Sequence, residues 1–419
     1  HLRTGARRVA LVAPTGSGKT VMGADMVRGA ERRGRGILFV AHRRELISQT
    51  CNKLDDLGIN HGVIMANHPR YQPSWPVQVA SIQTLVRRDI RPKADLVIVD
   101  ECHRIRGKTY EDVLALYPDA VVIGLTATPW RTDGKGLGQV FQAIVVASTV
   151  KELQALGHLV PVTGFAYDAP DLRAVAKVRG DYDDRGLELV MGGKRLLGNM
   201  VEQWQKHAAG ERTVVFAVNV AHSKEIASRF QAAGVRAEHL DGATPTSQRD
   251  AILRRLRTGE TTVVCSVNVI SEGWDEPLVS CAVLARPTLS VGLYLQMAGR
   301  ILRPAPGKRV ARIHDHAGVI LQHGPPDMER DYSLESDVRV TKKSDKPPPM
   351  STCKKCFAIF LSELGACPLC GAVNARVLRP LTETTDGVTA IPIESIRAPV
   401  QASESTRRAY YRQLLAKAQ

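Results

Sequence analysis

The sequence predicts an α/β protein with two tandem domains, each built on a parallel sheet, followed by a small cysteine module. Strand-like apolar runs alternate with helix-like stretches in two separate series along the 419 residues. A glycine-rich loop interrupts the first series directly after its first strand. Two close pairs of cysteines follow the second series. These three observations predict how the chain divides into domains.

The two series define the expected domains. Strand-like runs of the first series lie at 9–12, 37–41, 77–80, 96–99 and 120–125. The second series has strand-like runs at 213–217, 237–240, 262–266 and 281–285, with helix-like stretches at 223–233 and 247–257. Residues 170–193 lack a clear period, and three prolines end the basic stretch 342–349. We therefore expect a first domain at 1–165, a connecting segment at 166–194, a second domain at 195–330, a linker at 331–348, the cysteine module at 349–375 and a tail with a helix at 376–419.

The glycine-rich loop from Ala13 to Thr20 has the spacing of a phosphate-binding P-loop. Backbone N–H groups of such a loop point inward at an anion, and the positive end of the following helix adds to them. Lys19 is expected to contact the β and γ phosphates of a nucleoside triphosphate, and Thr20 to hold Mg²⁺. A glycine-rich turn before an ordinary helix is the alternative. The predicted nucleotide-binding residues are Thr15, Gly16, Ser17, Gly18, Lys19 and Thr20.

An acidic pair, Asp100 and Glu101, directly follows the strand-like run 95–99. Carboxylates at the carboxyl end of a strand face the ligand crevice of an open α/β sheet. Asp100 is expected to hold the Mg²⁺ shell and Glu101 to orient and deprotonate the attacking water, as phosphoryl transfer requires. For this pair taken alone, an acidic helix N-cap after a strand is the alternative.

Composition restricts the class of protein and its partners. The 44% hydrophobic and 24% charged content is ordinary for a soluble globular chain, and no apolar run has the length of a membrane helix. The first residues carry no apolar signal-peptide core, so we expect a cytoplasmic protein without a membrane partner. The formal net charge of +15 favours a nucleic-acid partner, although scattered surface arginines would also produce it.

Neither end of the chain has the features of a domain end. The P-loop lies too close to His1 to leave room for the strand and helix that usually precede it. The helix-like run 405–419 ends without a glycine or proline stop signal. We therefore expect natural sequence to precede His1 and to continue beyond Gln419.

The cysteine module contains two Cys-x₂-Cys pairs, formed by Cys353, Cys356, Cys367 and Cys370. Four thiolates at this spacing suit tetrahedral Zn²⁺, which would supply the folding energy of a module too small for its own core. Two disulfides and an iron–sulfur cluster are the alternatives. The lysines around the module fit either phosphate contact or a solvated linker. The remaining cysteines are expected to be packed thiols: Cys51, Cys102, Cys265 and Cys281.

The order of motifs resembles that of the superfamily 2 helicases along nearly the whole chain. In the first domain the matching segments are 13–20 (motif I), 41–46 (Ia), 81–85 (Ib), 100–103 (II, Asp-Glu-Cys-His) and 126–129 (III, Thr-Ala-Thr-Pro). In the second they are 214–216 (IV), 269–275 (V) and 296–303 (VI). Segments 305–308, 315–318 and 323–325, with the cysteine pairs behind them, resemble the RadD (YejH) group of bacterial repair ATPases and related phage helicases.

This resemblance implies two RecA-like P-loop NTPase domains that share one ATP site, with the phosphate cradle on the first and arginine fingers on the second. Arg300 and Arg303 of motif VI would neutralise charge in the transition state. Gln296 and His103 would pass information between nucleotide and nucleic acid. Surface arginines or salt-bridge partners are the alternative for an isolated arginine.

The resemblance implies further roles near the domain interface. Thr126 and Thr128 would link the two domains, and Gly273 and Asp275 would lie beside the nucleotide. Trp274 either stacks on a base or packs as an apolar wedge on its own domain. A nucleic-acid strand would lie across both domains, held mainly by its phosphates and sugars. The implied contacts are Arg43, Arg44, Gln83, Thr84, Ser271 and Glu272, with solvated helix residues as the alternative for the two arginines.

Two departures from the DEAD-box RNA group favour DNA. Motif II ends in Cys-His rather than Ala-Asp, and motif VI begins with Gln rather than His. The adenine-reading glutamine motif is not in this chain, so the preference for ATP rests on the resemblance. We expect an ATP- and Mg²⁺-dependent DNA helicase or translocase of a bacterial or phage-infected cell, acting on single-stranded or branched DNA in repair, recombination or replication, with a single-strand-binding protein as a candidate partner.

Three other functions remain open at this point. The first is an RNA-directed helicase, and the second is a nucleic-acid-stimulated ATPase that remodels protein complexes without unwinding. The third is a nonhydrolysing scaffold that binds through its zinc module. The presence of Glu101 and both motif VI arginines speaks against the scaffold, which has no use for them.

Overall fold

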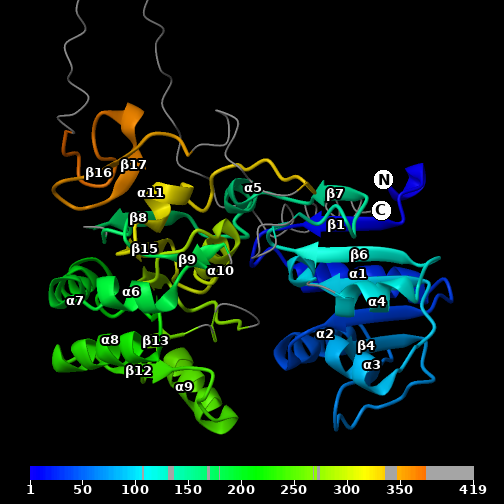
Figure 1. Cartoon of the computed structure of the whole chain (residues 1–419). Helices are drawn as coiled ribbons and strands as arrows, with labels where there is room; N and C mark the ends of the chain where they lie inside the picture. The colour runs from blue at the N-terminus through cyan, green and yellow to red at the C-terminus, as the bar shows by residue number, and fades with distance from the viewer. Residues whose placement is uncertain are drawn as a thin grey trace, which may run out of the picture.

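Two parallel sheets form the cores of two α/β domains that lie side by side (Figure 1), as the sequence predicts. The computed structural model describes residues 1–105, 108–130, 136–167, 170–178, 180–267, 269–270, 274–335 and 347–373. The predicted C-terminal tail with its helix lies outside these ranges. Among the described residues, no helix combines the length and apolarity that crossing a membrane requires.

The first sheet has seven parallel strands in the order β3-β4-β2-β5-β6-β1-β7. These are β1 (Arg8–Val12), β2 (Ile37–Ala41), β3 (Gly62–Ile64), β4 (Val77–Ser81), β5 (Leu96–Asp100), β6 (Val121–Thr126) and β7 (Ala143–Val146). One face is covered by α1 (Lys19–Glu31) and α2 (Arg44–Asp56), the other by α3 (Ile82–Arg88) and α4 (Lys108–Ala115). Because both faces are covered, the central strands are apolar runs without alternation.

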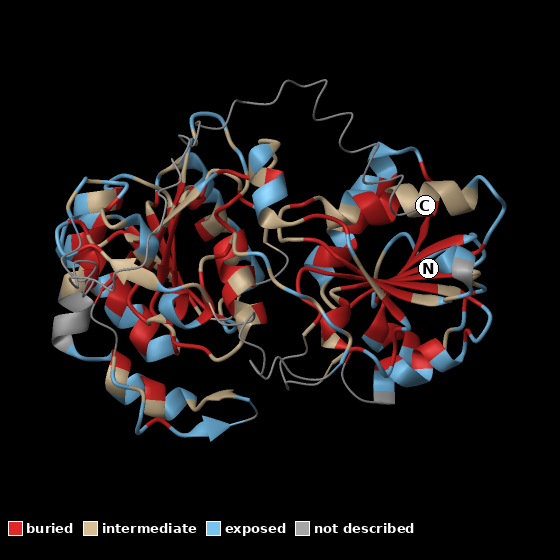
Figure 2. Ribbon diagram, turned by 90° about the horizontal axis from the view of Figure 1, so that it is seen from above, coloured by how far each residue is buried: buried red, intermediate tan, exposed pale blue. Residues whose placement is uncertain are grey.

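The second sheet has six parallel strands in the order β12-β13-β11-β14-β15-β8. These are β8 (Val162–Ala166), β11 (Thr213–Phe216), β12 (Ala237–Leu240), β13 (Val263–Ser266), β14 (Cys281–Leu284) and β15 (Ala311–Asp315). One face carries α5 (Val150–Ala155), α9 (Thr246–Thr258), α10 (Val291–Gly299) and α11 (Val319–His323), and the other carries α7 (Lys194–Ala208) and α8 (Val220–Ala232). Figure 2 shows the buried residues gathered along the strands of both domains.

The border between the domains lies before the expected residue 165. β7 is the last strand of the first sheet, and α5 already packs into the second core through Leu153. β8 pairs in parallel with β15 in the second sheet. The sequence could not reveal this pairing, because β8 and its partner strand lie at opposite ends of the domain and no local pattern connects them.

The expected connecting segment 166–194 folds against the second domain. It contains an antiparallel hairpin, β9 (Lys177–Val178) with β10 (Asp181–Tyr182), and helix α6 (Asp184–Met191). Asp181 accepts hydrogen bonds from Thr288 Oγ1 at 2.6 Å and from the Leu289 backbone N–H at 2.7 Å. The crossing between the domains is therefore made by the residues between β7 and α5 and not by this segment.

The cysteine module is attached to the second domain and is not the separate unit that we expected. Its strands β16 (Met350–Thr352) and β17 (Ile359–Leu361) form an antiparallel hairpin, which lies beside β8 and α11 (Figure 1). The Ala166 N–H donates to the Phe357 carbonyl at 3.0 Å. Phe165 packs in one cluster with Cys353 and Phe360. The edge strand β8 therefore supplies the apolar partner surface that so small a module lacks.

Candidate nucleotide site and cysteine cluster

The P-loop lies at the carboxyl end of β1, and two glycines shape its backbone. Gly16 and Gly18 have φ values of 86° and 85°, in the left-handed region that favours glycine. Gly18 is the N-cap of α1, so the unpaired N–H groups of the first helical turn lie at the loop. Lys19 Nζ donates to the carbonyls of Ala13 at 3.1 Å and Pro14 at 3.3 Å. The loop thus has the backbone conformation and the lysine of a phosphate site.

The acidic pair lies at the end of β5, facing the P-loop lysine. Glu101 has a φ of 49°, an uncommon conformation for a residue other than glycine and one that concentrates at functional sites. Burial and the charge of Glu101 raise the pKa of Asp100, whereas Lys19 acts to lower it. Burial also acts to raise the pKa of Glu101, but His103, Lys19 and Arg300 outweigh it and the pKa is lowered. Glu101 is therefore ionised at neutral pH, the form that a general base requires.

Arg300 and Arg303 line the same cleft as the P-loop and the acidic pair. This cleft encloses about 800 Å³, within the range of small-molecule sites. Arg300 is 5% exposed, and burial lowers its pKa to about 9, so it stays cationic at neutral pH. Arg303 forms an ion pair with Asp275, and a Cβ added to Gly16 would lie 3.0 Å from Arg303 Cγ. The guanidinium groups of the second domain thus meet the phosphate loop of the first.

Two glycines on α10 let this helix approach the first domain closely. A Cβ added to Gly299 would overlap the side chain of Thr15 in the P-loop. A Cβ added to Gly292 would lie 3.1 Å from Thr128 Oγ1. Larger side chains at these positions would push the second domain away from the nucleotide site.

A hydrogen-bonded chain crosses the domain interface from α10 to the acidic pair. Gln296 Nε2 lies 3.1 Å from His103 Nε2, and His103 Nδ1 lies 3.0 Å from Thr126 Oγ1 and 3.3 Å from Glu101 Oε2. Because an amide nitrogen only donates, His103 Nε2 accepts and the ring proton resides on Nδ1. Thr126 Oγ1 donates in turn to the Thr128 carbonyl at 2.6 Å. Gln296, His103, Thr126 and Thr128 are thereby joined in one buried hydrogen-bonded network, which lies 3.3 Å from Glu101 Oε2.

The residues predicted to contact nucleic acid lie in different environments. Arg43 is half-buried and Arg44 exposed at the start of α2. Gln83 is exposed in the first turn of α3, directly after the neighbouring strand β4, and its Nε2 donates to the His42 carbonyl at 3.3 Å. Thr84 is 8% exposed, so its side chain is largely covered. The structure brings Arg43, Arg44 and Gln83 together. Ser271 and Glu272 lie outside the described residues, as does Gly273, which was predicted to lie beside the nucleotide.

The backbone carbonyl of Trp274 is a site element that sequence reasoning missed. It accepts hydrogen bonds from Arg300 at 2.5 Å and from Arg303 at 3.5 Å, so it orients both guanidinium groups. No sequence signal marks it, because every residue has a carbonyl. The Trp274 side chain packs against the core of the second domain, which favours the wedge interpretation over base stacking.

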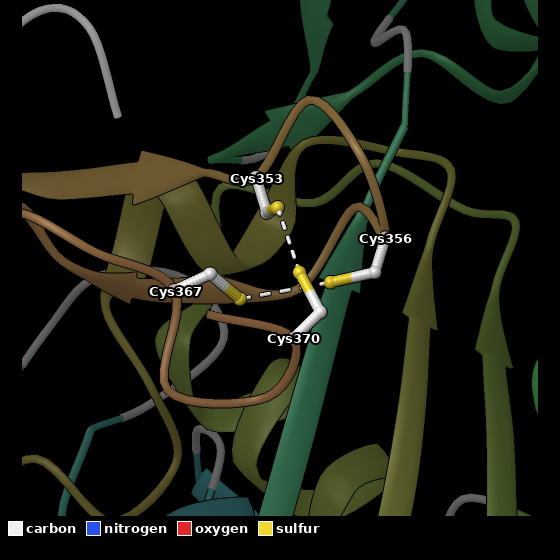
Figure 3. Close-up of side chains that lie close together, drawn as sticks. All are labelled: Cys353, Cys356, Cys367 and Cys370. Atoms are coloured by element: carbon white, nitrogen blue, oxygen red, sulfur yellow. Dashed lines mark hydrogen bonds between the residues drawn. The ribbon is translucent and has the colours of Figure 1, made fainter. Parts of the chain in front are cut away.

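The four cysteines of the module converge on one point (Figure 3). Their sulfur atoms all lie within 4.8 Å of one another, with Cys353–Cys370 and Cys356–Cys367 separations of 3.6 Å. Zn–S bonds of about 2.3 Å in a tetrahedron place sulfurs about 3.8 Å apart, whereas a disulfide requires about 2.05 Å. The cluster therefore fits one tetrahedral ion and not two disulfides. The other four cysteines are buried elsewhere, at Cys51, Cys102, Cys265 and Cys281.

Two family models match the chain, one on each domain. Residues 1–131 match the res subunit of type III restriction enzymes, and residues 194–305 match the helicase conserved C-terminal domain. A 51.5 kDa protein of a Lactococcus phage (isolate 7-9) is 31% identical over 360 residues, which are 85% of this chain and 76% of the phage protein. IRC3 of Saccharomyces cerevisiae, named as an ATP-dependent helicase, is 29% identical over 344 residues. That match covers 76% of this chain and 49% of IRC3, so the chain spans about half of this relative.

Solved structures share the arrangement of two such domains. A fragment assigned as the HsdR subunit of a type I restriction enzyme from Vibrio vulnificus YJ016 has a TM-score of 0.62 at 19% identity. The match covers 79% of this chain and 64% of that one. Dbp5 of S. cerevisiae, bound to RNA and ADP BeF3, has a TM-score of 0.51 at 16% identity, and the match covers 74% of this chain and 79% of Dbp5. These likenesses establish the fold.

Proposed function

Because this chain belongs to the superfamily 2 helicases, we propose that its ATP hydrolysis drives translocation along DNA or the unwinding of DNA. The observation that carries this proposal is the composite cleft, in which Lys19 and Glu101 of one domain face Arg300 and Arg303 of the other. Neither domain holds a complete hydrolytic set. Hydrolysis is therefore tied to the relative position of the domains, which is what a motor requires.

Each group in the cleft has a distinct part in the proposed reaction. The P-loop N–H groups and Lys19 bind the triphosphate, while Glu101 orients the attacking water and accepts its proton. Arg300 and Arg303 stabilise negative charge that develops on the transferring phosphoryl group. The Asp100 carboxylate, with the Thr20 hydroxyl, offers the oxygen donors that Mg²⁺ prefers, and this ion supplies charge neutralisation between the phosphates when bound.

DNA is the proposed polymer because two positions depart from the DEAD-box RNA group. Cys102, fully buried in the first-domain core beside the acidic pair, takes the place of its alanine, and Gln296 at the domain interface takes the place of its histidine. The resemblance to the RadD group further supports a role in DNA repair, recombination or replication, with a single-strand-binding protein as a candidate partner. The exposed Arg44 and Gln83 are proposed to contact the phosphates and sugars of the strand.

ATPase assays with single-stranded DNA, branched DNA and RNA test this proposal. We expect DNA to raise kcat more than RNA does, and Lys19→Ala to abolish turnover in every case. Strand displacement assayed beside the ATPase separates unwinding from translocation. DNA binding should weaken with a log-log salt slope of about −0.7 for each phosphate neutralised on a single strand. Stimulation by RNA alone would reassign the polymer, and ATPase retained in Lys19→Ala would overturn the site.

Gln296→Leu is expected to uncouple ATP hydrolysis from nucleic acid. Leucine fills a similar volume but leaves His103 Nε2 without a donor inside a buried network. We expect the ratio of DNA-stimulated to basal kcat to fall about fivefold or more, in the range of ordinary coupling energies. The measurement is kcat with and without saturating single-stranded DNA.

The matched control for this change is Gln322→Leu on α11, where the side chain is exposed. Its stimulation ratio should equal that of the unmodified protein. If Gln296→Leu also keeps the full ratio, the His103–Gln296 bond does not carry the coupling.

We further propose that the four-cysteine cluster holds one structural zinc ion. Metal analysis of the purified protein should find about one zinc per chain, because the four sulfurs offer one tetrahedral site. Chelation or Cys370→Ser should make residues 347–373 sensitive to protease, since the two cysteine pairs of the module would lose the ion that joins them.

Cys51→Ala is the control for the zinc proposal, because this thiol is buried in the first domain away from the cluster. Its zinc content should be unchanged. Absence of zinc from protein purified without chelator, or full zinc content in Cys370→Ser, would contradict the assignment.

A further inference from the structure

The chain makes a second connection between the domains through residues 324–335, which we call the strap. The strap leaves α11 of the second domain and runs toward the first domain near β7 (Figure 1). The sequence places these residues at the end of the second domain and in a linker. In the structure both ends of the strap are held by specific contacts, one on each domain.

The first half of the strap is held on the second domain. Tyr294 Oη on α10 donates to the Gly324 carbonyl at 3.0 Å. Arg330 donates to three carbonyls, those of Met328 at 2.9 Å, Pro325 at 3.0 Å and His323 at 3.1 Å. Arg330 thus closes the strap into a compact loop against the helix that carries motif VI.

The second half of the strap is held on the first domain. The Tyr332 ring lies 5.1 Å from the ring of Trp130, the residue that follows motif III. The Leu334 side chain packs on the first-domain core, and its carbonyl accepts the Gly138 N–H at 2.8 Å. A Cβ added to Gly136 would overlap the Leu334 carbonyl, so the backbones touch at this point.

The middle of the strap lies against the nucleotide site. Together with Pro14 and Thr15 of the P-loop and Gly299 of α10, residues 326–332 close a small cavity of about 30 Å³. On its other side, residues 325–329 line a groove with the cysteine module. The same few residues therefore line spaces that they share with the phosphate loop and the motif VI helix on one side and with the cysteine module on the other.

We infer that the strap positions the arginine fingers against the P-loop by limiting how far the two domains separate. A single crossing between β7 and α5 would allow wide opening. A second attachment restricts the second domain to orientations in which Arg300 and Arg303 stay near the first. Tyr332 and Leu334 are accordingly positioning residues. Only the expected fall in kcat rests on the proposed ATPase function. The restraint on domain separation does not depend on it.

Tyr332→Ala and Leu334→Ala test the strap through two independent measurements. Without nucleotide, energy transfer between dyes introduced as unnatural amino acids at exposed Asn60 and Ala233 should shift to a more open population. In steady-state assays kcat should fall about fivefold or more with little change in KM for ATP, because the phosphate cradle is intact. Tyr332→Phe should restore both properties, since the ring contact remains.

Tyr71→Ala is the matched control, because this tyrosine is 43% exposed on the first domain. It should leave both measurements unchanged, and the thermal unfolding midpoint of each variant checks that it folds. If both alanine variants show the energy transfer and the kcat of the unmodified protein, the inference that the strap limits domain separation is wrong. If the unmodified protein has no ATPase activity, the proposed function is wrong. The energy-transfer measurement would then still show whether the strap limits domain separation.

Discussion

Replacing Glu101 by glutamine will lower kcat for ATP hydrolysis by about 10²- to 10⁴-fold, the usual contribution of a general base. Glutamine keeps the size of the side chain but cannot accept the proton of the attacking water. The loss should fall on kcat, because the P-loop and Lys19 still bind the triphosphate. Single-turnover hydrolysis and nucleotide binding, measured on the same preparation, separate the two effects.

Glu225→Gln on α8 is the matched control for the Glu101 change. Glu225 forms an exposed helical ion pair with Arg229 at 2.8 Å, of a kind that contributes little to stability. Its kcat should equal that of the unmodified protein. Near-normal turnover in Glu101→Gln would remove Glu101 from the role of base.

Arg300→Ala should reduce kcat by about 10³- to 10⁵-fold, the effect expected for an arginine finger in phosphoryl transfer. Arg300 is buried, is held by the Trp274 carbonyl and lines the cleft with Glu101. Its removal deletes positive charge at the place where negative charge develops. Arg300→Lys should also be strongly impaired, because an ammonium group lacks the planar fork of a guanidinium.

The two Arg300 variants together distinguish loss of chemistry from loss of fold. Arg229→Ala removes an exposed arginine from the surface ion pair and should preserve kcat. Thermal unfolding should show that Arg300→Lys remains folded at the assay temperature. Rapid hydrolysis by folded Arg300→Lys and Arg300→Ala would show that the cleft works without this finger.

Local patterns were sufficient to predict the parts of the site that each lie within a few residues. The loop from Ala13 to Thr20 and the pair Asp100-Glu101 each stand directly after a strand, so their place at the edge of a parallel sheet follows from the sequence. The resemblance of motif VI to the helicase pattern implied a site shared by the two domains. The structure confirms the two-domain parallel-sheet architecture and brings these residues to one cleft.

Long-range pairings could not be predicted in the same way. The sequence placed residues 162–165 in the first domain, whereas β8 joins the second sheet beside β15. It treated the cysteine module as separate, whereas Phe165 and Ala358 form a bridge between that module and β8. In both cases the segment that a strand pairs with lies far along the chain, and the sequence of such a short strand contains no pattern that identifies this partner.

The sequence by itself predicted the proposed chemistry: which groups would bind phosphate, which carboxylate would activate water and which cysteines would converge, because these predictions depend on residue type at close spacing. Only the tertiary structure decided how the halves of the site are held together. Contacts between distant segments do this. The Trp274 carbonyl accepts hydrogen bonds from both arginines, glycines let α10 approach the P-loop, and Tyr332 of the strap packs against Trp130. Such contacts depend on backbone atoms and shape complementarity, which residue identity alone does not specify.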